Sequence, residues 1–262
     1  MDSIWNTFHY LVWNPIYKIE KPFQIYSDVP AEAEDQRQTN LKFELAPTAE
    51  IIQDVRGRES LFTLDSNGFQ YIKHHSNVSE YEFRDGTGVE DRYLPECELV
   101  LKQQLDGVDE ILLFDWRIRR SETSFQHGQI VDFNDKHTVF GPVKTPHVDA
   151  SPGYVIEVVE RNFPDRADFL LSGRVRWINL WRPLGQPVEC CPFAVSDGTT
   201  VRETGLVEAN RVRRALVNST LFAMYQEDVK WYYMSQQTPS DLLIFKNFDS
   251  QEGVAKCECL RS

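Results

Sequence analysis

The sequence has no apolar run that approaches the roughly 18 residues of a membrane-spanning helix. Its first five residues lack the basic region and apolar stretch of a secretory signal peptide, so export is not expected. Positive charge is scarce as well, with 28 Lys and Arg against 40 Asp and Glu, for a net charge of −12. Nucleic acids and anionic membrane surfaces attract clustered Lys and Arg, so the charge balance argues against both as partners.

Cysteines are few and show no disulfide-scaffold spacing. There are five of them, an odd number, which indicates a reducing compartment and predicts a cytoplasmic location. Internal repeats, low-complexity tracts and Gly/Ser linkers are also absent. A chain of 262 residues that is 41% hydrophobic can bury one large core. We therefore expect a single domain over residues 1–262, with an irregular N-terminal arm over about residues 1–50 that is rich in Pro, Glu and Gln.

Hydrophobic periodicity predicts helices early in the chain and strands in its second half. Helices are expected over residues 89–105 and 152–171, the second with a break near Pro164. Strands are expected over residues 61–65, 69–72, 110–116, 143–148, 174–181, 230–234 and 242–246. Short strands separated by turns favour a β-sandwich, a jelly roll or a barrel.

Histidine is missing from the whole chain after residue 147. The motif that carries chemistry is His147-Val148-Asp149. Alternate residues of a strand share a face, so the two outer residues of this motif can bind one small ion. An imidazole and a carboxylate on one face are two of the three ligands in the 2-His-1-carboxylate triad that holds non-heme Fe(II). The alternative is a surface histidine beside an Asp149 that caps a helix beginning at Pro152.

Several segments, taken in order and spacing, resemble the fungal asaB-like hydroxylase/desaturase family, which is related to cephem methoxylases. The likeness extends from about residue 15 to about residue 256. Its segments are 54–60, 64–70, 114–116 with Arg119 and Arg120, 147–152, 178–184, 231–234, and 243–246 with 248–250. Each segment alone is unspecific, and the set together is specific.

The resemblance implies a mainly β fold with flanking α-helices, a double-stranded β-helix or jelly roll. It implies Fe(II) and 2-oxoglutarate as cofactor and co-substrate, with O₂ as a reactant. It also implies hydroxylation or desaturation of a small lipophilic fungal secondary metabolite, such as a terpenoid or meroterpenoid. His147 and Asp149 are the metal ligands that the family pattern gives.

The chain departs from the family pattern after residue 250. There the family has a third iron-binding histidine, followed on a late strand by an arginine that pairs with 2-oxoglutarate. Leu260 falls about where the histidine is expected. The resemblance thus predicts an incomplete triad and a jelly roll whose last core strand is missing. Cys257 and Cys259 are possible substitutes, although thiolate is a soft ligand that suits this kind of iron site poorly.

Two further pairs of residues are candidates for ligand binding. Arg182 and Asn179 are expected to contact the co-substrate or, for Arg182, a substrate carboxylate. The alternative is a structural role for each, which for Arg182 is an ion pair. Trp231 and Tyr233 are expected to line the substrate pocket, although aromatic strand residues more often lie in a core.

The missing ligand predicts an auxiliary function. A jelly roll without its last strand exposes an unpaired edge and apolar side chains, which a partner would cover. We therefore expect a non-catalytic or auxiliary subunit in a heterodimer with a complete homologous oxygenase subunit. Two alternatives stay open: an active dioxygenase with an unconventionally completed site, and a metabolite-binding protein.

Overall fold

The structure is a computed structural model that describes residues 3–121, 135–214, 216–256 and 260–261. Its strands are β1 (Ile4–Asn6), β2 (His9–Leu11), β3 (Phe23–Ile25), β4 (Phe43–Leu45), β5 (Glu50–Asp54), β6 (Phe69–Lys73), β7 (His147–Val148), β8 (Arg176–Trp181), β9 (Ala194–Ser196), β10 (Leu206–Val212), β11 (Val217–Ala223), β12 (Trp231–Tyr233), β13 (Asp241–Asp249) and β14 (Leu260–Arg261). Its α-helices are α1 (Leu64–Asn67), α2 (Glu80–Asp85), α3 (Leu94–Gln104), α4 (Pro152–Asn162) and α5 (Ala167–Leu171). Short 3-10 and π turns lie at Pro15–Lys18, Glu59–Leu61, Val89–Tyr93 and Glu203–Gly205.

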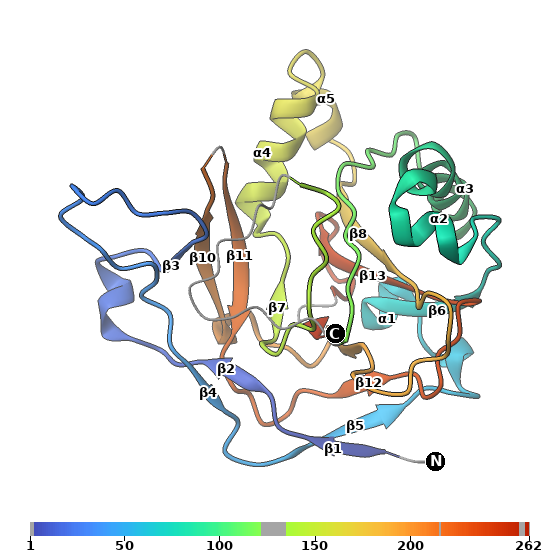
Figure 1. The fold of residues 1–262 in the computed structure, drawn as a ribbon, viewed down its shortest axis with the longest axis horizontal. Helices are drawn as coiled ribbons and strands as arrows, with labels where there is room; N and C mark the ends of the chain where they lie inside the picture. The colour runs from blue at the N-terminus through green and yellow to red at the C-terminus, as the bar shows by residue number, and fades with distance from the viewer. Residues whose placement is uncertain (1–2, 122–134, 215, 257–259, 262) are drawn as a thin grey trace.

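The strands form a large sheet and two small ones. The nine-stranded sheet has the order β1-β5-β12-β9-β14-β7-β11-β10-β3, and the three-stranded sheet has the order β6-β13-β8. Strands β2 and β4 pair separately. Figure 1 shows the two larger sheets on either side of a central space, with α2 and α3 outside the smaller sheet. This sheet-rich arrangement with few helices is consistent with the expected jelly-roll-like fold.

Strand β13 is the centre of the smaller sheet and is buried on both faces. Leu243 and Phe245 pack in a cluster with β6 and β12, whereas Leu242 and Ile244 pack in a cluster against α3. Alternate residues of a strand point to opposite faces, so β13 joins the core between the sheets to the core under the helices.

The periodic segments were predicted correctly where they are long. The helix over 89–105 is present as a π turn followed by α3. The helix over 152–171 is present as α4 and α5, with Pro164 in the break. The strands predicted at 174–181, 230–234 and 242–246 are β8, β12 and β13.

Two predicted strands are not strands. Residues 61–65 lead into helix α1, because the Thr63 hydroxyl accepts from the Ser66 N–H and so caps a helix. Gly68 ends that helix with φ of 86°, a left-handed conformation that suits glycine. Residues 110–116 pair with no described strand and lie instead on a cavity wall.

Both ends of the described chain join the nine-stranded sheet. The expected irregular arm over residues 1–50 contributes β1 and β3 to it, and Phe8 from the same region is fully buried. Strand β14 lies between β9 and β7, where the missing core strand was expected, and pairs there over two residues. No helix among the described residues is long and apolar enough to cross a membrane.

Candidate functional site

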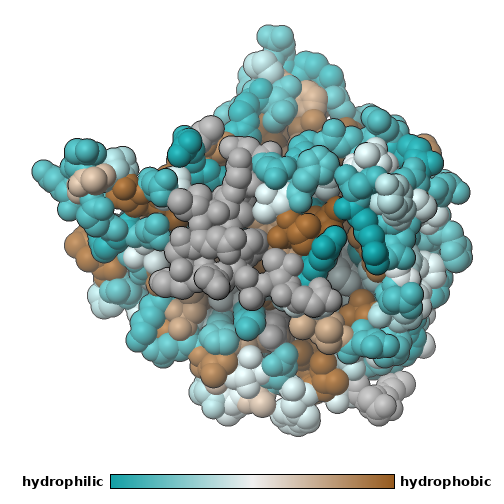
Figure 2. Space-filling model, in the orientation of Figure 1, coloured by the Kyte–Doolittle hydropathy of each residue, from teal (hydrophilic) through white to brown (hydrophobic). Residues whose placement is uncertain are grey.

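A cavity of about 2410 Å³ lies between the sheets, larger than the roughly 300–1,000 Å³ of common ligand pockets. Figure 2 shows hydrophobic residues in the hollow at the centre of the face that is turned to the viewer. Strand β8 supplies one wall, because Trp177, Asn179 and Trp181 alternate with Ile178 and Leu180, which pack in the core under α3. The other aromatic residues on the wall include Phe114, Trp116, Phe140, Phe193 and Phe222.

His147 is buried at the base of this cavity on β7, which pairs with β11 on one side and β14 on the other. Its Nδ1 lies 2.9 Å from the carbonyl oxygen of Thr145. A carbonyl only accepts, so Nδ1 carries the proton and the neutral ring has its lone pair at Nε2. This backbone contact is the kind that orients metal-binding histidines.

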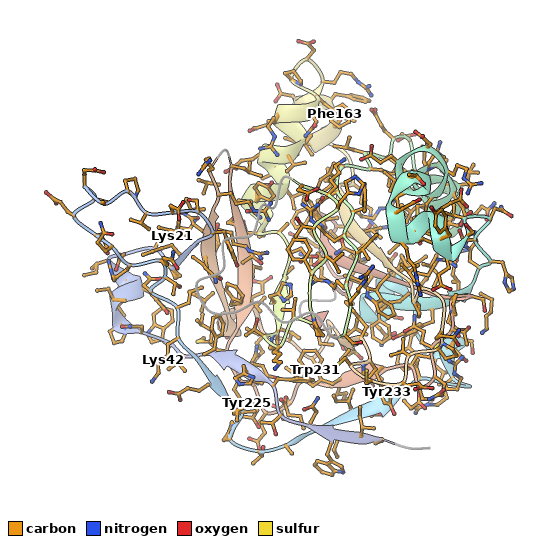
Figure 3. The ribbon with its side chains drawn as sticks, viewed as in Figure 1. Lys21, Lys42, Phe163, Tyr225, Trp231 and Tyr233 are labelled. Carbon is orange, nitrogen blue, oxygen red and sulfur yellow. The ribbon has the colours of Figure 1, made fainter. Side chains whose placement is uncertain are left out.

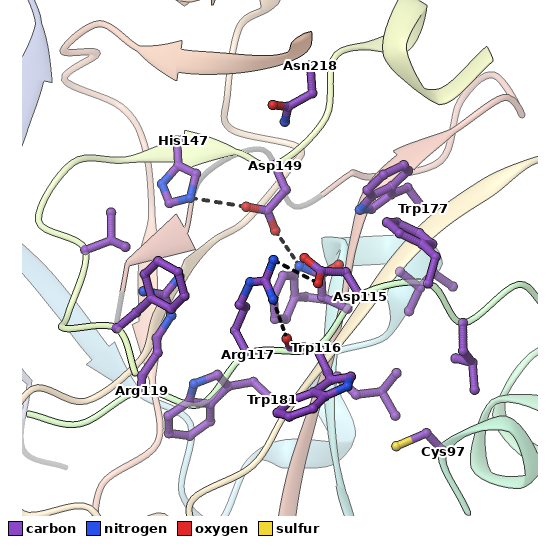
Figure 4. Close-up of a pocket in the computed structure, with 18 of the residues that line it drawn as sticks. Cys97, Asp115, Trp116, Arg117, Arg119, His147, Asp149, Trp177, Trp181 and Asn218 are labelled. Atoms are coloured by element: carbon purple, nitrogen blue, oxygen red, sulfur yellow. Dashed lines mark hydrogen bonds and ion pairs between the residues drawn. The ribbon is translucent and has the colours of Figure 1, made fainter. Parts of the chain in front are cut away.

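Asp149 lies beside this lone pair. His147 Nε2 is 3.3 Å from Asp149 Oδ1, and Figure 4 shows the two side chains pointing toward one another. Two ligands at adjacent octahedral positions, with bonds of about 2.1 Å, stand ~3 Å apart. The pair therefore fits two ligands of one small cation.

The Asp149 carboxylate is held from several sides. Asn179 Nδ2 donates to the Oδ2 atom of this carboxylate. The backbone N–H of Asp149 donates to Asn247 Oδ1 at 3.1 Å, which also fixes the main chain. Desolvation alone would raise the pKa of Asp149, but the neighbouring His147, the hydrogen bond from Asn179 and the charge of Arg211 outweigh it and hold this pKa at about 2. The helix-capping alternative is excluded, because Ser151 caps α4.

The third position of a triad has no ligand among the described residues. Leu260 on β14 lies directly opposite His147, and leucine has no donor atom. The described part of the chain has no group of three or more His, Cys, Asp and Glu that could hold a metal ion. Cys257 and Cys259 lie outside it. The residues present thus fit Fe(II) at two positions and not at three.

The two predicted co-substrate residues differ in their surroundings. Asn179 lies at the site, as the partner of Asp149. Arg182 donates to the carbonyl oxygens of His74 and Pro239, at 2.9 and 2.5 Å, and to the Tyr93 hydroxyl at 3.1 Å. These contacts tie β8 to the turns beside β6 and β13. They favour a structural role for Arg182, made through neutral acceptors and not through the ion pair that was expected.

The prediction that Trp231 and Tyr233 line the substrate pocket needs correction. Both lie in the core, and neither is among the described residues that line the cavity. Trp231 Nε1 donates to Glu50 at 3.1 Å, and its ring packs on Phe8 with centroids 4.6 Å apart. Figure 3 shows both side chains on β12 at the lower side of the molecule. The cavity wall carries Trp177 and Trp181 instead, on one face of β8.

A charged row on the segment before residue 121 was also missed. Asp115, Arg117 and Arg119 alternate along this segment and line the cavity. Arg117 forms an ion pair with Asp115 at 3.2 Å. Burial raises the pKa of Asp115, and the charge of Arg117 opposes that rise. The alternation was visible in the sequence, but residues 110–116, which include Asp115, were predicted to be a buried strand, and the charged residues beyond them were not considered for the site.

Comparison with known proteins gives a consistent picture. A family profile described as "Oxidoreductase/YMDC permease-like domain" matches residues 9–259. The chain is 29% identical over 204 residues to the alpha-ketoglutarate-dependent dioxygenase tstK of Talaromyces stipitatus, covering 76% of this chain and 71% of tstK. It is 28% identical over 220 residues to the Fe(II)/2-oxoglutarate-dependent dioxygenase nvfI of Aspergillus novofumigatus, covering 82% and 74%. These relatives are fungal Fe(II)/2-oxoglutarate-dependent dioxygenases.

The fold agrees with that of a solved relative. The structure of the iron and alpha-ketoglutarate-dependent endoperoxidase NvfI superposes with a TM-score of 0.79 at 25% identity. The match covers 98% of this chain and 89% of that one. The chain therefore shares the NvfI fold over nearly its full described length.

Proposed function

The chain belongs to the family described as "Oxidoreductase/YMDC permease-like domain", and we propose that it is a non-catalytic, auxiliary subunit of an Fe(II)/2-oxoglutarate-dependent oxygenase. Its partner is a complete homologous subunit, and the pair hydroxylates or desaturates a small lipophilic metabolite such as a terpenoid or meroterpenoid. The observation that carries the proposal is the register of β14, which puts Leu260 opposite His147.

An iron site with two protein ligands is held weakly, because each ligand contributes to affinity and geometry. The large aromatic cavity is nevertheless retained. A protein that keeps the pocket and lacks a metal ligand fits a role in binding or shaping the substrate better than a role in turnover. When bound, Fe(II) with 2-oxoglutarate supplies O₂ activation, which this proposal assigns to the partner.

An apolar pair at a sheet edge is the surface that we assign to the partner. β1 is the end strand of the nine-stranded sheet, and Trp5 on it lies directly opposite Ile51 on β5. The two are 66% and 47% exposed, which is unusual for large apolar residues. An unpaired strand edge beside exposed apolar side chains is a common place for another chain to dock.

The test is succinate formation from 2-oxoglutarate with Fe(II) and ascorbate. It is measured for this chain alone, for a complete homologue from the same organism alone, and for their mixture. Activity of the mixture above that of the homologue supports the auxiliary role. If Trp5→Ser loses this gain in activity, the docking surface is supported. Leu61→Ser is the matched control, because Leu61 is also 66% exposed. A mixture no more active than the homologue refutes both.

A second candidate is an oxygenase that is active by itself. It is favoured by the Thr145 carbonyl, which holds the His147 lone pair toward Asp149 as a metal ligand requires. In that case His147 and Asp149 bind the metal, Asn179 orients Asp149, and a partner side chain or water completes the site. Succinate formation by the single chain, abolished in His147→Ala, would establish this candidate over the first.

A further inference from the structure

Two arginines on the cavity wall act on the same carboxylate. Arg119 lies on the segment before residue 121, and Arg211 lies on β10. Arg211 shares a sheet face with His147, because Phe222 on β11 lies opposite His147 and Asn218, on the same face of β11, lies opposite Arg211. Arg119 lines the same cavity, and its charge interacts with those of Arg211 and Asp149. Figure 4 shows Arg119 in the same pocket as His147 and Asp149.

Neutral groups hold both guanidiniums in place. Arg119 Nη1 donates to the Gly141 carbonyl at 2.9 Å, and its guanidinium lies 5.8 Å from the centroid of the Phe140 ring. Arg211 donates to the Tyr26 hydroxyl at 3.2 and 3.3 Å and lies 5.2 Å from the centroid of that ring. These contacts fix the two cations without neutralising them.

The positive charge of this pair is not balanced by the described protein. Neither Arg119 nor Arg211 has a carboxylate of a described residue within 4 Å. The nearby Asp149 carboxylate already accepts a hydrogen bond from Asn179 and lies 3.3 Å from His147 Nε2. Desolvation is the main cause that lowers the pKa of Arg119, and Arg211 adds to it. An arginine cannot lose its proton in a protein, so the charge remains and favours an anionic ligand.

A polar group without a partner lies next to the pair. Asn218 on β11 is directly opposite Arg211 in the β10–β11 register and lines the cavity. It is 8% exposed, and its buried Oδ1 has no hydrogen-bond partner among the described residues. A buried amide oxygen without a partner costs free energy, so a polar ligand or its bound water is expected here.

We propose that Arg119 and Arg211 form a carboxylate-binding site on the cavity wall beside Asp149, with Asn218 as a neutral contact. The ligand chemistry is a carboxylate, from either a 2-oxo dicarboxylic acid or a carboxylate-bearing metabolite. The proposal deepens the proposed function, because it names the ligand class of the same cavity, but it requires neither a metal nor a partner subunit.

The experiment is calorimetric titration of the full chain with 2-oxoglutarate in metal-free buffer with a chelator, at low salt. Arg119→Met and Arg211→Met each weaken binding by about tenfold or more, since each removes a charge-assisted hydrogen bond. Arg119→Lys and Arg211→Lys keep the charge and lose less affinity. Arg202→Met is the matched control, because Arg202 is 60% exposed and lies off the cavity, and it binds as the wild type does.

A second titration distinguishes the two carboxylate sources. Decanoate stands for a lipophilic monocarboxylate, and dimethyl 2-oxoglutarate is the uncharged control. Arginine-dependent binding of 2-oxoglutarate supports a co-substrate site, and arginine-dependent binding of decanoate supports a metabolite site.

If neither acid binds, or if folded Met variants bind as the wild type does, the proposal is overturned. Circular dichroism checks folding, and the Lys variants serve if a Met variant does not fold. Succinate assays test the auxiliary role separately.

Discussion

Leu260 on β14 lies directly opposite His147 on β7, in the antiparallel pair at the base of the cavity. Directly opposite residues of such a pair lie on one face of the sheet. Leu260→His therefore adds an imidazole at the register position next to the His147–Asp149 pair. We expect affinity for Co(II) or Fe(II) to rise by about tenfold or more, since a third ligand completes the facial triad.

Calorimetry measures this affinity, and Co(II) absorption reports the ligand set. Leu260→Ala is the control, which changes the size of the side chain and adds no donor atom. An affinity of Leu260→His equal to that of Leu260→Ala would show that position 260 is not the third ligand position.

Asn179 positions Asp149, and removing its amide loosens the carboxylate. In the Leu260→His protein, Asn179→Ala should weaken metal affinity by about tenfold, as expected for a group that orients a ligand. Asn162→Ala is the control, because Asn162 donates only to the Val158 carbonyl within α4. Both variants are measured by Co(II) titration. Equal affinities would mean that Asn179 does not orient Asp149.

Lys246 is fully buried and pairs with Asp249 at 2.6 Å and with Asp65 at 2.8 Å. Lys246→Met leaves Asp249, whose side chain is also fully buried, with Arg174 as its remaining cationic partner. Loss of one partner from a buried charge network costs about 3 kcal/mol of unfolding free energy. Urea denaturation measures it. Lys102→Met, in an exposed pair with Glu98, should change stability by less than about 0.5 kcal/mol.

Asp241 links stability to acid pH. Desolvation would raise its pKa, but hydrogen bonds from Lys73 and Thr238 outweigh it and lower the pKa from 3.8 to about 2. A lowered folded-state pKa stabilises the fold above about pH 4, and this contribution disappears as the pH falls from 4 to 2. It amounts to about 1 kcal/mol, because Lys73 is 64% exposed and solvent screens the pair.

Denaturation of the wild type and of Asp241→Asn at pH 2, 4 and 7 measures this effect. Asp241→Asn should have a flatter profile between pH 4 and pH 2 than the wild type. Parallel profiles would show that Asp241 does not contribute to the acid sensitivity.

The long amphipathic segments of the chain were predictable, because their periodicity alone specifies which face is buried. This holds for α3 and α4. Strand β13 was predictable for another reason, because a continuous apolar run is typical of a strand that is buried on both faces. The short segment at residue 63 was not predictable in the same way, because one hydrogen bond from the Ser66 N–H to the Thr63 hydroxyl caps a helix where a strand was expected. Residues 110–116 are apolar without forming a strand, because Ile111 and Leu113 pack against the core under α3 and the segment lines the cavity.

The sequence by itself determined the chemistry of the candidate site. The spacing of His147 and Asp149 on a strand puts both on one face whatever surrounds them. The absence of any histidine after residue 147 was equally visible in the sequence, as was the leucine at position 260.

Only the tertiary structure decided which residues meet that pair. Sheet pairing and the course of the segment before residue 121 bring three residues from separate parts of the chain toward Asp149. These residues are Asn179, Arg119 and Arg211. Trp231 could not be separated from Trp177 by sequence, because aromatic residues on strands look the same whether they face a core or a cavity. That choice depends on which sheets face each other, which is a property of long-range packing and not of local pattern.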